Sequence, residues 1–300
     1  MRIFVTGATG YIGGAVAVAL RRAGHDVRGL VRSPEKAARL RRYEIEPVVG
    51  DIGRPGSYHE ALDECSVLVH AAVDYGAGVV EPDRAAIDSL LAAASRGARP
   101  KTVLYTSGVW VYGDTRGRRV DETTPPTPER MVEWRPAHER LILESPGVRG
   151  LVIRPGCVYG LAGSLTGTWF ESVEREGKAT VVGDGTNRWA MVHVHDLADA
   201  YVRLAESGLA GEIFNVTDRS RSTLRDMAEA AAWAAGKPGA VRLVPVEEAV
   251  ESMGEIAHCL ALDQHVDSRK AVSRLGWQPR HGGFVDGVDT YYAAWKVRQG

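Results

Sequence analysis

The sequence has few cysteines, no excess of charge of either sign and no long apolar run. Three cysteines among 300 residues (Cys65, Cys157 and Cys259) are too few and too scattered for a disulfide framework or a zinc site, so a reducing cytoplasm is expected. The formal net charge of −1, from 37 basic and 38 acidic residues, argues against nucleic-acid or membrane-surface partners, which attract a basic excess. No apolar run reaches the roughly 18 residues of a membrane-spanning helix, and no signal peptide is indicated. A globular protein with a sizeable core remains, since 44% of the residues are hydrophobic.

The first thirteen residues, MRIFVTGATGYIG, predict a dinucleotide phosphate site. Arg2 to Thr6 contains an apolar run typical of a buried strand, and the run from Ala15 to Leu20 predicts a helix. Gly7, Gly10 and Gly13 lie between them at spacings of three. Glycine lets the backbone turn tightly and approach a pyrophosphate, and the helix N-terminus offers free amides and partial positive charge. The alternative is that these glycines serve only a tight turn, but the strand before and the helix after favour the phosphate site.

The spacing T-G-x-x-G-x-x-G resembles the short-chain dehydrogenase/reductase superfamily, in its extended, epimerase/dehydratase-like branch. The resemblance implies an α/β fold: a Rossmann-type doubly wound parallel sheet with a smaller C-terminal substrate-binding lobe. The alternation of strands and helices also predicts such a sheet. We expect residues 1–160, completed by about 191–217, to form the NAD(P)-binding domain, and residues 161–190 and 218–300 to form most of the lobe. The dinucleotide would lie on Gly7, Thr9, Gly10, Tyr11, Ile12 and Gly13.

The end of the second strand, Asp26 to Val31, indicates which nicotinamide cofactor binds. An acidic side chain there would bond the ribose hydroxyls of NAD, whereas a basic one accommodates the 2′-phosphate of NADP. The strand is followed by Arg32 and Ser33 and has no acid at its end. A guanidinium pairs well with phosphate, so NADP(H) is predicted over NAD(H). The alternative is that Arg32 is a solvated loop charge.

Further cofactor contacts follow from the resemblance alone. In this family an Asp-hydrophobe pair after the third strand lies beside the adenine, a small-residue turn follows the fourth strand, and a loop after the sixth strand approaches the nicotinamide carboxamide. An aspartate at a strand end can equally be a turn or cap residue. The residues implied are Asp51, Ile52, Ala71, Ala72, Val73, Pro155, Gly156 and Val158.

The segment from Thr106 to Gly113 is similar to the family's Ser-Ser-x-x-Val-Tyr-Gly. The resemblance implies that Ser107 hydrogen-bonds the substrate carbonyl, with Thr106 beside it at the cofactor. The alternative is a strand-end hydroxyl that caps a turn.

The helix expected from Pro128 to Glu144 departs from the family pattern. The family places Tyr-x-x-x-Lys on this helix, where the lysine lowers the pKa of the tyrosine acid/base. Arg135 takes the lysine position, which puts Met131 at the tyrosine position. A thioether cannot transfer a proton at neutral pH, whereas an arginine can hold the cofactor ribose or a substrate anion. The alternative for Arg135 is a surface ion pair with Glu139, and Pro136 would kink or start the helix.

The proton donor therefore has to be sought elsewhere. Tyr75, on the loop after the fourth strand, could face the nicotinamide, and His138 carries an imidazole that can transfer a proton. Water could also supply the proton.

His193 and His195 would place two rings on one face of a strand, but no third ligand has a fitting spacing, so no metal site is predicted.

In the second half, Leu275 to Pro279 resembles the C-terminal signature of the extended branch. Trp169 and Phe170 are expected over the substrate cleft, and Asp196 is expected to cap the helix that follows it.

The function predicted is an NADP(H)-dependent oxidoreductase acting on a carbonyl or hydroxyl of a small organic molecule, with an atypical active site. The alternatives are an NAD(P)-dependent epimerase, dehydratase or isomerase and a non-catalytic NADP(H)-binding regulator. The lack of a basic patch disfavours a nucleotide sugar, although Arg188 and Arg221 leave it open. A small-molecule substrate is expected, with homodimerisation left open.

Overall fold

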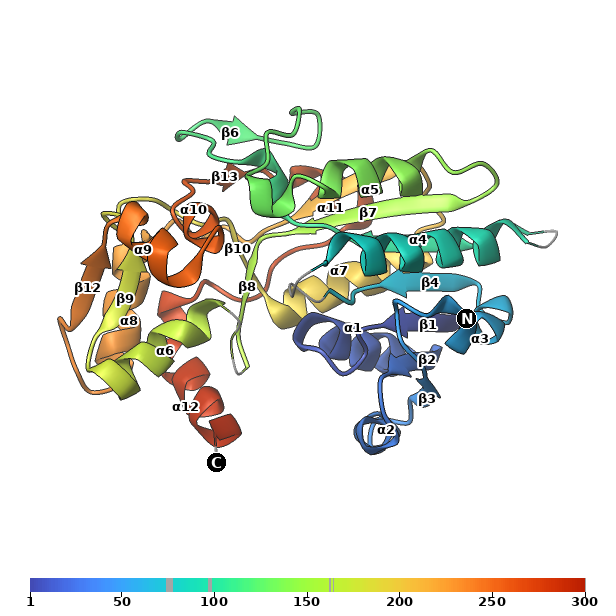
Figure 1. Ribbon diagram of the computed structural model, residues 1–300, viewed down its shortest axis with the longest axis horizontal. Coiled ribbons are helices and arrows are strands. Elements are labelled where there is room, and N and C mark those ends of the chain that lie inside the picture. Colours follow the sequence, from blue (N-terminus) through green and yellow to red (C-terminus); the bar gives the residue numbers. More distant parts are fainter. Residues whose placement is uncertain (74–77, 97–98, 162, 164, 300) are drawn as a thin grey trace.

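A seven-stranded parallel sheet forms the centre of the computed structural model, which describes residues 1–73, 78–96, 99–161, 163 and 165–299 (Figure 1). Its strands are β1 (Arg2–Thr6), β2 (Asp26–Val31), β3 (Glu46–Val49), β4 (Val67–His70), β5 (Thr102–Thr106), β7 (Arg149–Pro155) and β11 (Glu212–Val216). They lie in the order β11-β7-β5-β4-β1-β2-β3, and the neighbouring strands pair in parallel. The predicted doubly wound sheet is confirmed.

Helices cover both faces of this sheet. One face carries α1 (Tyr11–Arg22), α2 (Pro34–Arg41), α7 (Val194–Glu206) and α11 (Arg269–Leu275), and the other carries α3 (His59–Asp63), α4 (Val80–Ser95) and α5 (Arg135–Leu143). Successive residues of a strand point to opposite faces, so Ile3 and Val5 join the first layer while Phe4 joins the second. All three are fully buried, which explains why β1 is a continuous apolar run.

Trp277, from the C-terminal part of the chain, closes the first of these layers. It is fully buried in the same core as Val16 and Leu20 of α1. Its indole nitrogen donates to the backbone oxygen of Asp196 at 2.8 Å. A residue near the end of the chain is thus part of the core that includes the first helix.

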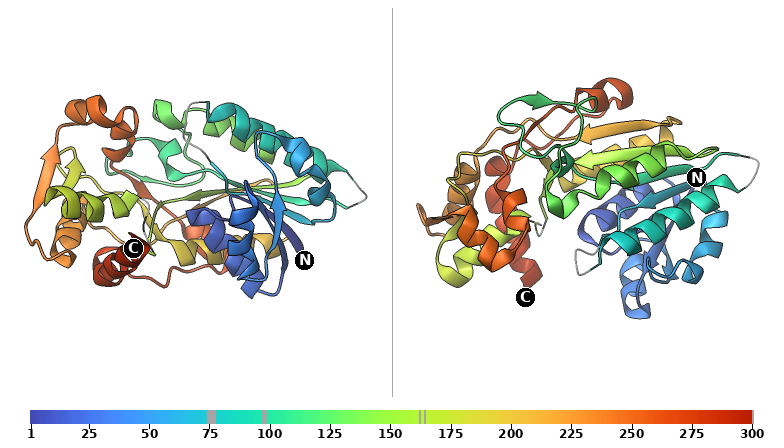
Figure 2. Two further views of the ribbon diagram at one scale, coloured as in Figure 1. Left: turned by 60° about the horizontal axis from the view of Figure 1, so that its bottom comes forward. Right: turned by 45° about the horizontal axis from the view of Figure 1, so that its top comes forward.

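A smaller lobe with its own aromatic core lies at one end of the sheet (Figures 1 and 2). It contains α6 (Leu165–Glu176), α8 (Leu224–Ala234), α9 (Val246–Met253), α10 (Ile256–Leu260), α12 (Val288–Gln299) and the strand pair β9 (Ala179–Val182) and β12 (Val241–Val244). Trp169 and Phe170 are buried in this core, and Trp169 stacks on Trp189 with ring centroids 5.5 Å apart. The prediction that they lie over the substrate cleft is wrong, because the lobe uses them for its own packing.

Short elements connect the two parts. They are the strand pairs β8 (Cys157–Tyr159) with β10 (Met191–His193) and β6 (Arg119–Val120) with β13 (His265–Val266), and the 3-10 turns η2 (Val109–Tyr112) and η3 (Arg130–Val132). Two further 3-10 turns lie within the parts themselves: η1 (Pro55–Ser57) packs on α4 of the sheet, and η4 (Val285–Gly287) packs on α8 of the lobe. No helix in the described part of the chain is long and apolar enough to cross a membrane.

Two helix starts differ from the predictions. The helix expected from Pro128 begins at Arg135, because Pro136 in its first turn suits a helix start, and Met131 lies before it in η3. Helix α7 begins at Val194 and is capped by the His193 side chain, which accepts from the backbone nitrogen of His195 at 3.2 Å. The prediction that Asp196 caps this helix is therefore wrong.

Candidate active site

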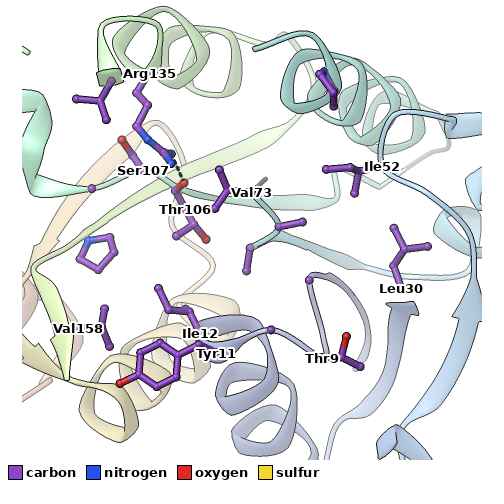
Figure 3. A pocket seen from close by; sticks show the side chains of 18 of the residues that line it. Thr9, Tyr11, Ile12, Leu30, Ile52, Val73, Thr106, Ser107, Arg135 and Val158 are labelled. Carbon is purple, nitrogen blue, oxygen red and sulfur yellow. Dashed lines mark hydrogen bonds between the residues drawn. The ribbon is translucent and has the colours of Figure 1, made fainter. Parts of the chain in front are cut away.

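A cleft of about 850 Å³ lies where the strand order reverses, at the C-terminal ends of β1 and β4 (Figure 3). In open α/β sheets this crevice is where ligands bind. The residues that the sequence predicted for the site and that line this cleft are Gly7, Thr9, Gly10, Tyr11, Ile12, Arg32, Asp51, Ile52, Ala71, Ala72, Val73, Thr106, Ser107, Arg135, Pro155, Gly156 and Val158.

The glycine turn between β1 and α1 leaves room for a phosphate. Gly7 has φ +68°, and a Cβ there would lie 2.7 Å from the backbone oxygen of Ala71, so a side chain would force the turn apart. A Cβ at Gly13 would collide with the backbone oxygen of Gly7. Gly10 is the N-cap of α1 and has no side chain to occupy the amides of the first turn. These amides are therefore available to an anion, which fits the pyrophosphate of an NAD(P)-type dinucleotide.

The end of the cleft beyond this turn combines apolar and basic side chains. Leu30 and Ile52 line it together with Asp51, at the ends of β2 and β3 (Figure 3). Arg32, directly after β2, and Lys36, one turn into α2, line the same end. This arrangement suits an adenosine flanked by positive charge.

The opposite end of the cleft carries hydroxyl groups at the end of β5. The Thr106 hydroxyl donates to the backbone oxygen of His70 at 2.7 Å and lies 2.5 Å from the hydroxyl of Tyr201. The backbone nitrogen of Ser107 donates to Ile153 at 2.8 Å, which fixes the turn. The Ser107 side chain is 6% exposed, and its oxygen has no hydrogen-bond partner among the described residues. The hydrogen-bonding capacity of this buried hydroxyl is thus unused among the described residues.

Arg135 lies next to these hydroxyls (Figure 3). It is 5% exposed, and its Nη1 donates to the backbone oxygen of Thr106 at 3.0 Å and to the Tyr105 hydroxyl at 3.4 Å. Its guanidinium carbon also lies 4.5 Å from the centroid of the Trp134 ring. These contacts support the prediction that Arg135 lies in the cleft. They place a fixed positive charge beside Ser107.

A buried carboxylate, Asp83 of α4, anchors the layer behind Arg135. Its Oδ1 lies 3.1 Å from His70 Nε2, and its Oδ2 lies 2.7 Å from His138 Nδ1 and 3.1 Å from the Tyr105 hydroxyl. Burial alone would raise the pKa of Asp83, but the hydrogen bonds from His138 and His70 and the nearby charge of Arg135 hold this pKa below its usual range. The group is therefore an anion at the centre of a buried network.

The hydrogen bonds of Thr6 assign the tautomer of His70. The Thr6 hydroxyl oxygen accepts from the backbone nitrogens of Ala71 and Ala72, at 3.1 and 3.2 Å. Its own proton therefore goes to His70 Nδ1, 2.7 Å away, which leaves the His70 proton on Nε2 to be donated to Asp83. The network thus links α4 to the turn that follows β4 in the cleft.

Some predicted site residues do not line the cleft. Gly13 packs against the glycine turn, and Ser33 is the N-cap of α2. His138 is 4% exposed and holds the buried carboxylate, so its position does not support the predicted role as proton donor. Tyr75 lies outside the described residues.

Other residues also line the cleft; of these, the sequence had singled out Met131, at the tyrosine position of the family, but not the rest. Trp110 lies within the segment from Thr106 to Gly113, Cys157 lies between two predicted residues, and Lys36 comes four residues after Arg32, so the neighbours of the predicted residues indicate these three. Burial raises the pKa of the Cys157 thiol to about 12, so the group stays neutral and behaves as a small hydrophobe. The full set is Leu30, Val31, Lys36, Gly50, Gly78, Pro82, Gly108, Val109, Trp110, Met131, Val132, Cys157, Leu165 and Ile256.

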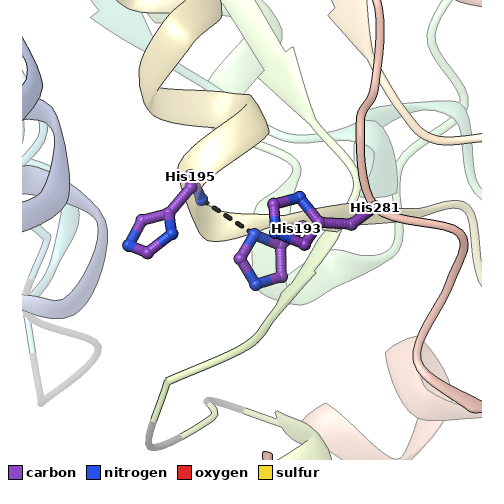
Figure 4. A group of neighbouring side chains, drawn as sticks. All are labelled: His193, His195 and His281. Carbon is purple, nitrogen blue, oxygen red and sulfur yellow. Dashed lines mark hydrogen bonds between the residues drawn. The ribbon is translucent and has the colours of Figure 1, made fainter. Parts of the chain in front are cut away.

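Outside the cleft, three histidines gather between α7 and the C-terminal segment (Figure 4). His281 joins His193 and His195, with ligand atoms within 4.8 Å of one another, so the expectation that no third ligand lies near is wrong. However, the rings of His193 and His281 stack with centroids 3.4 Å apart, and His281 Nδ1 lies 3.0 Å from Asp196 Oδ2. The lone pairs lie in the ring planes, so one ion could bind all three only after this stack opened.

The buried position of His193, stacked on His281, predicts that the free energy of unfolding depends on pH. Burial, and the neighbouring His281 and His195, lower the pKa of His193 from its ordinary 6.5 to about 3. Between these two pH values the imidazole is protonated in the unfolded chain but neutral in the native protein. The free energy of unfolding therefore decreases as the pH falls from 6.5 towards 3. We expect His193 to account for a loss of roughly 2 kcal/mol in the free energy of unfolding between pH 7 and pH 5.

Urea unfolding at both pH values checks this result. His193→Asn is the matched variant, because asparagine can still cap α7 but does not titrate. The variant should lose less stability than the wild type over this range, and equal losses would contradict the assignment.

Comparisons with known proteins agree with this geometry. An uncharacterised protein of Schizosaccharomyces pombe is 28% identical, covering 97% of this chain and all of its own. A 4-hydroxy-2-methyl-3-oxo-4-farnesyl-3,4-dihydroquinoline-1-oxide ketoreductase of Stigmatella aurantiaca is 30% identical, covering 75% of this chain and 70% of its own. The fold is similar to that of a dTDP-glucose 4,6-dehydratase from Streptomyces venezuelae solved with NAD (TM-score 0.84, 22% identity, 100% of this chain and 98% of the other).

A model of the NAD-dependent epimerase/dehydratase family matches residues 3–217, which include all seven strands of the sheet and the glycine turn. The chain belongs to this family, in the extended branch of the short-chain dehydrogenase/reductase superfamily, and is an NAD(P)-dependent enzyme of the oxidoreductase or epimerase type.

Proposed function

We propose that this protein is an NADP(H)-dependent reductase of a ketone carbonyl in a small organic molecule. The observation that carries the proposal concerns Ser107, which lines the cleft beside Arg135: its buried hydroxyl has no hydrogen-bond partner among the described residues. A buried hydroxyl left unpaired costs about 1–3 kcal/mol, so a ligand acceptor is its expected partner. The ketoreductase among the relatives supports a carbonyl oxygen as that acceptor.

Different residues of the cleft have different roles in this reaction. The cofactor, when bound, supplies the hydride. The glycine turn and the amides of α1 hold its pyrophosphate, and the Ser107 hydroxyl donates a hydrogen bond to the substrate oxygen. The fixed charge of Arg135 stabilises the negative charge that develops on that oxygen. Solvent supplies the proton, because Met131 cannot donate one.

Arg32 and Lys36 support NADP(H) over NAD(H). Both line the adenosine end of the cleft, where a 2′-phosphate would lie. Arg32→Asp should therefore weaken NADPH binding by more than about tenfold, or roughly 1.4 kcal/mol, while NADH binding changes little. Calorimetric titration with both cofactors measures this. Arg39→Asp, at an exposed position of α2 outside the cleft, is the matched control, and equal losses for NADPH and NADH would contradict the phosphate role.

Consumption of NADPH with a panel of carbonyl compounds, followed at 340 nm, tests the reductase directly. Turnover with a ketone is the expected result. Tight NADPH binding without turnover on any carbonyl would instead favour the non-catalytic regulator, for which Met131 is the supporting observation.

A further inference from the structure

We infer that the substrate is an uncharged aryl ketone rather than a nucleotide sugar, an inference that rests on the reductase function proposed above. Four apolar side chains wall the Ser107 end of the cleft: Trp110 in η2, Met131 in η3, Leu165 at the start of α6 and Ile256 at the start of α10. Each is partly exposed. Separate segments of the chain thus bring apolar surface to one place.

Core packing explains only part of this apolar surface. Met131 and Ile256 belong to none of the hydrophobic clusters formed by the described residues, and Trp110 and Leu165 only flank the core of the lobe. Apolar surface facing water is unfavourable, and its coverage by an apolar molecule is favourable. The wall therefore has the character of a binding surface for an apolar body.

The charges at this end do not suit a diphosphate. Among the described residues, Arg135 is the only charged side chain that lines it. Arg188 and Arg221, which the sequence left open as diphosphate ligands, are not part of the described lining. Arg188 Nε donates to the backbone oxygen of Arg221 at 3.0 Å, and Arg221 Nη1 lies 2.5 Å from His265 Nε2. A nucleoside diphosphate would bring two phosphates to a site with too little positive charge to bind them.

The chemistry of the wall favours an aromatic body. An indole packs well against another ring, and a thioether makes favourable contacts with ring edges. Trp110 and Met131 provide these two groups, while Ser107 provides the hydrogen-bond donor for one oxygen. The carbonyl oxygen would bind Ser107, and the ring would lie among the four apolar side chains.

Calorimetric titration of the NADP⁺-saturated protein with 2-acetonaphthone, acetone and UDP tests this assignment. We expect 2-acetonaphthone to bind at least about tenfold more tightly than acetone, and UDP not to compete with it. Met131→Gln and Ile256→Asn should each weaken 2-acetonaphthone binding by about tenfold, because each replaces apolar contact area with a polar group. Met253→Gln, at an exposed position of α9 outside the cleft, is the matched control and should bind as the wild type does.

Two results would overturn the inference: tighter binding of UDP than of 2-acetonaphthone, or equal 2-acetonaphthone affinities in the wild type and both folded variants. The two variants lie in different elements, so the loss of one to misfolding leaves the other informative. NADPH oxidation by the same proteins tests the reductase separately. Tight 2-acetonaphthone binding without NADPH consumption would contradict the proposed reductase function and support the proposed substrate class. NADPH consumption with polar carbonyl compounds alone would support the reductase function and contradict the substrate class.

Discussion

Replacing Ser107 by alanine is expected to lower kcat/KM for carbonyl reduction by about 10²- to 10³-fold, the loss that follows removal of one donor to a developing oxyanion. The hydroxyl is already buried beside the cleft, and its turn is held by the Ser107 backbone nitrogen through its bond to Ile153. The donor would thus be lost without a change in the turn. Steady-state kinetics with NADPH and a reactive ketone measure the effect.

The control for this variant is the cofactor. Ser107→Ala should bind NADPH with wild-type affinity, since the pyrophosphate and adenosine ends of the cleft are unchanged. Ser95→Ala, at the exposed end of α4, should keep full activity. If Ser107→Ala retained most of its kcat/KM, Ser107 would be a turn residue and the proposed carbonyl contact would be lost.

Asp83→Asn is expected to lower the free energy of unfolding by about 3 kcal/mol or more, because it removes one member of a buried charged network. Three donors, from His70, His138 and Tyr105, point at the two carboxylate oxygens. An amide in this place must turn its own NH₂ group towards at least one of these donors. Urea unfolding at pH 7 measures the loss.

Asp88→Asn on the same helix is the matched comparison. Asp88 pairs with Arg84 at the surface, and exposed pairs of this kind contribute at most about 1 kcal/mol. Similar losses for the two variants would mean that the Asp83 network adds no more than a surface ion pair. NADPH binding by folded Asp83→Asn adds a second readout, because Tyr105 joins this network to Arg135.

The sheet and the phosphate turn could be predicted because their signals are local. A buried parallel strand is a continuous apolar run, as in β1, and the glycines of the turn follow it directly. The place of Arg32 at the end of such a strand indicated its part in the cleft, whereas Asp51 and Ala71 were implied by the family resemblance. These residues needed no knowledge of distant contacts.

The rest depends on packing between distant segments. Leu165 and Ile256 reach the cleft only because the lobe places α6 and α10 beside the sheet. His281 meets His193 for a similar reason, since the C-terminal segment is bound to the first turn of α7 through Asp196. No pattern in the flanking sequence of these residues indicates such neighbours.

The position of Trp277 bears on how the protein is made. Domains usually fold as units, the N-terminal one first, as the chain leaves the ribosome. Here the cofactor-binding core includes a residue that is translated late, because Trp277 is a fully buried member of the core that α1 and α7 share. A nascent chain that stops at Thr217 already holds all seven strands of the sheet but lacks this buried indole. The core of the cofactor-binding half is therefore complete only when the chain up to Trp277 has been made.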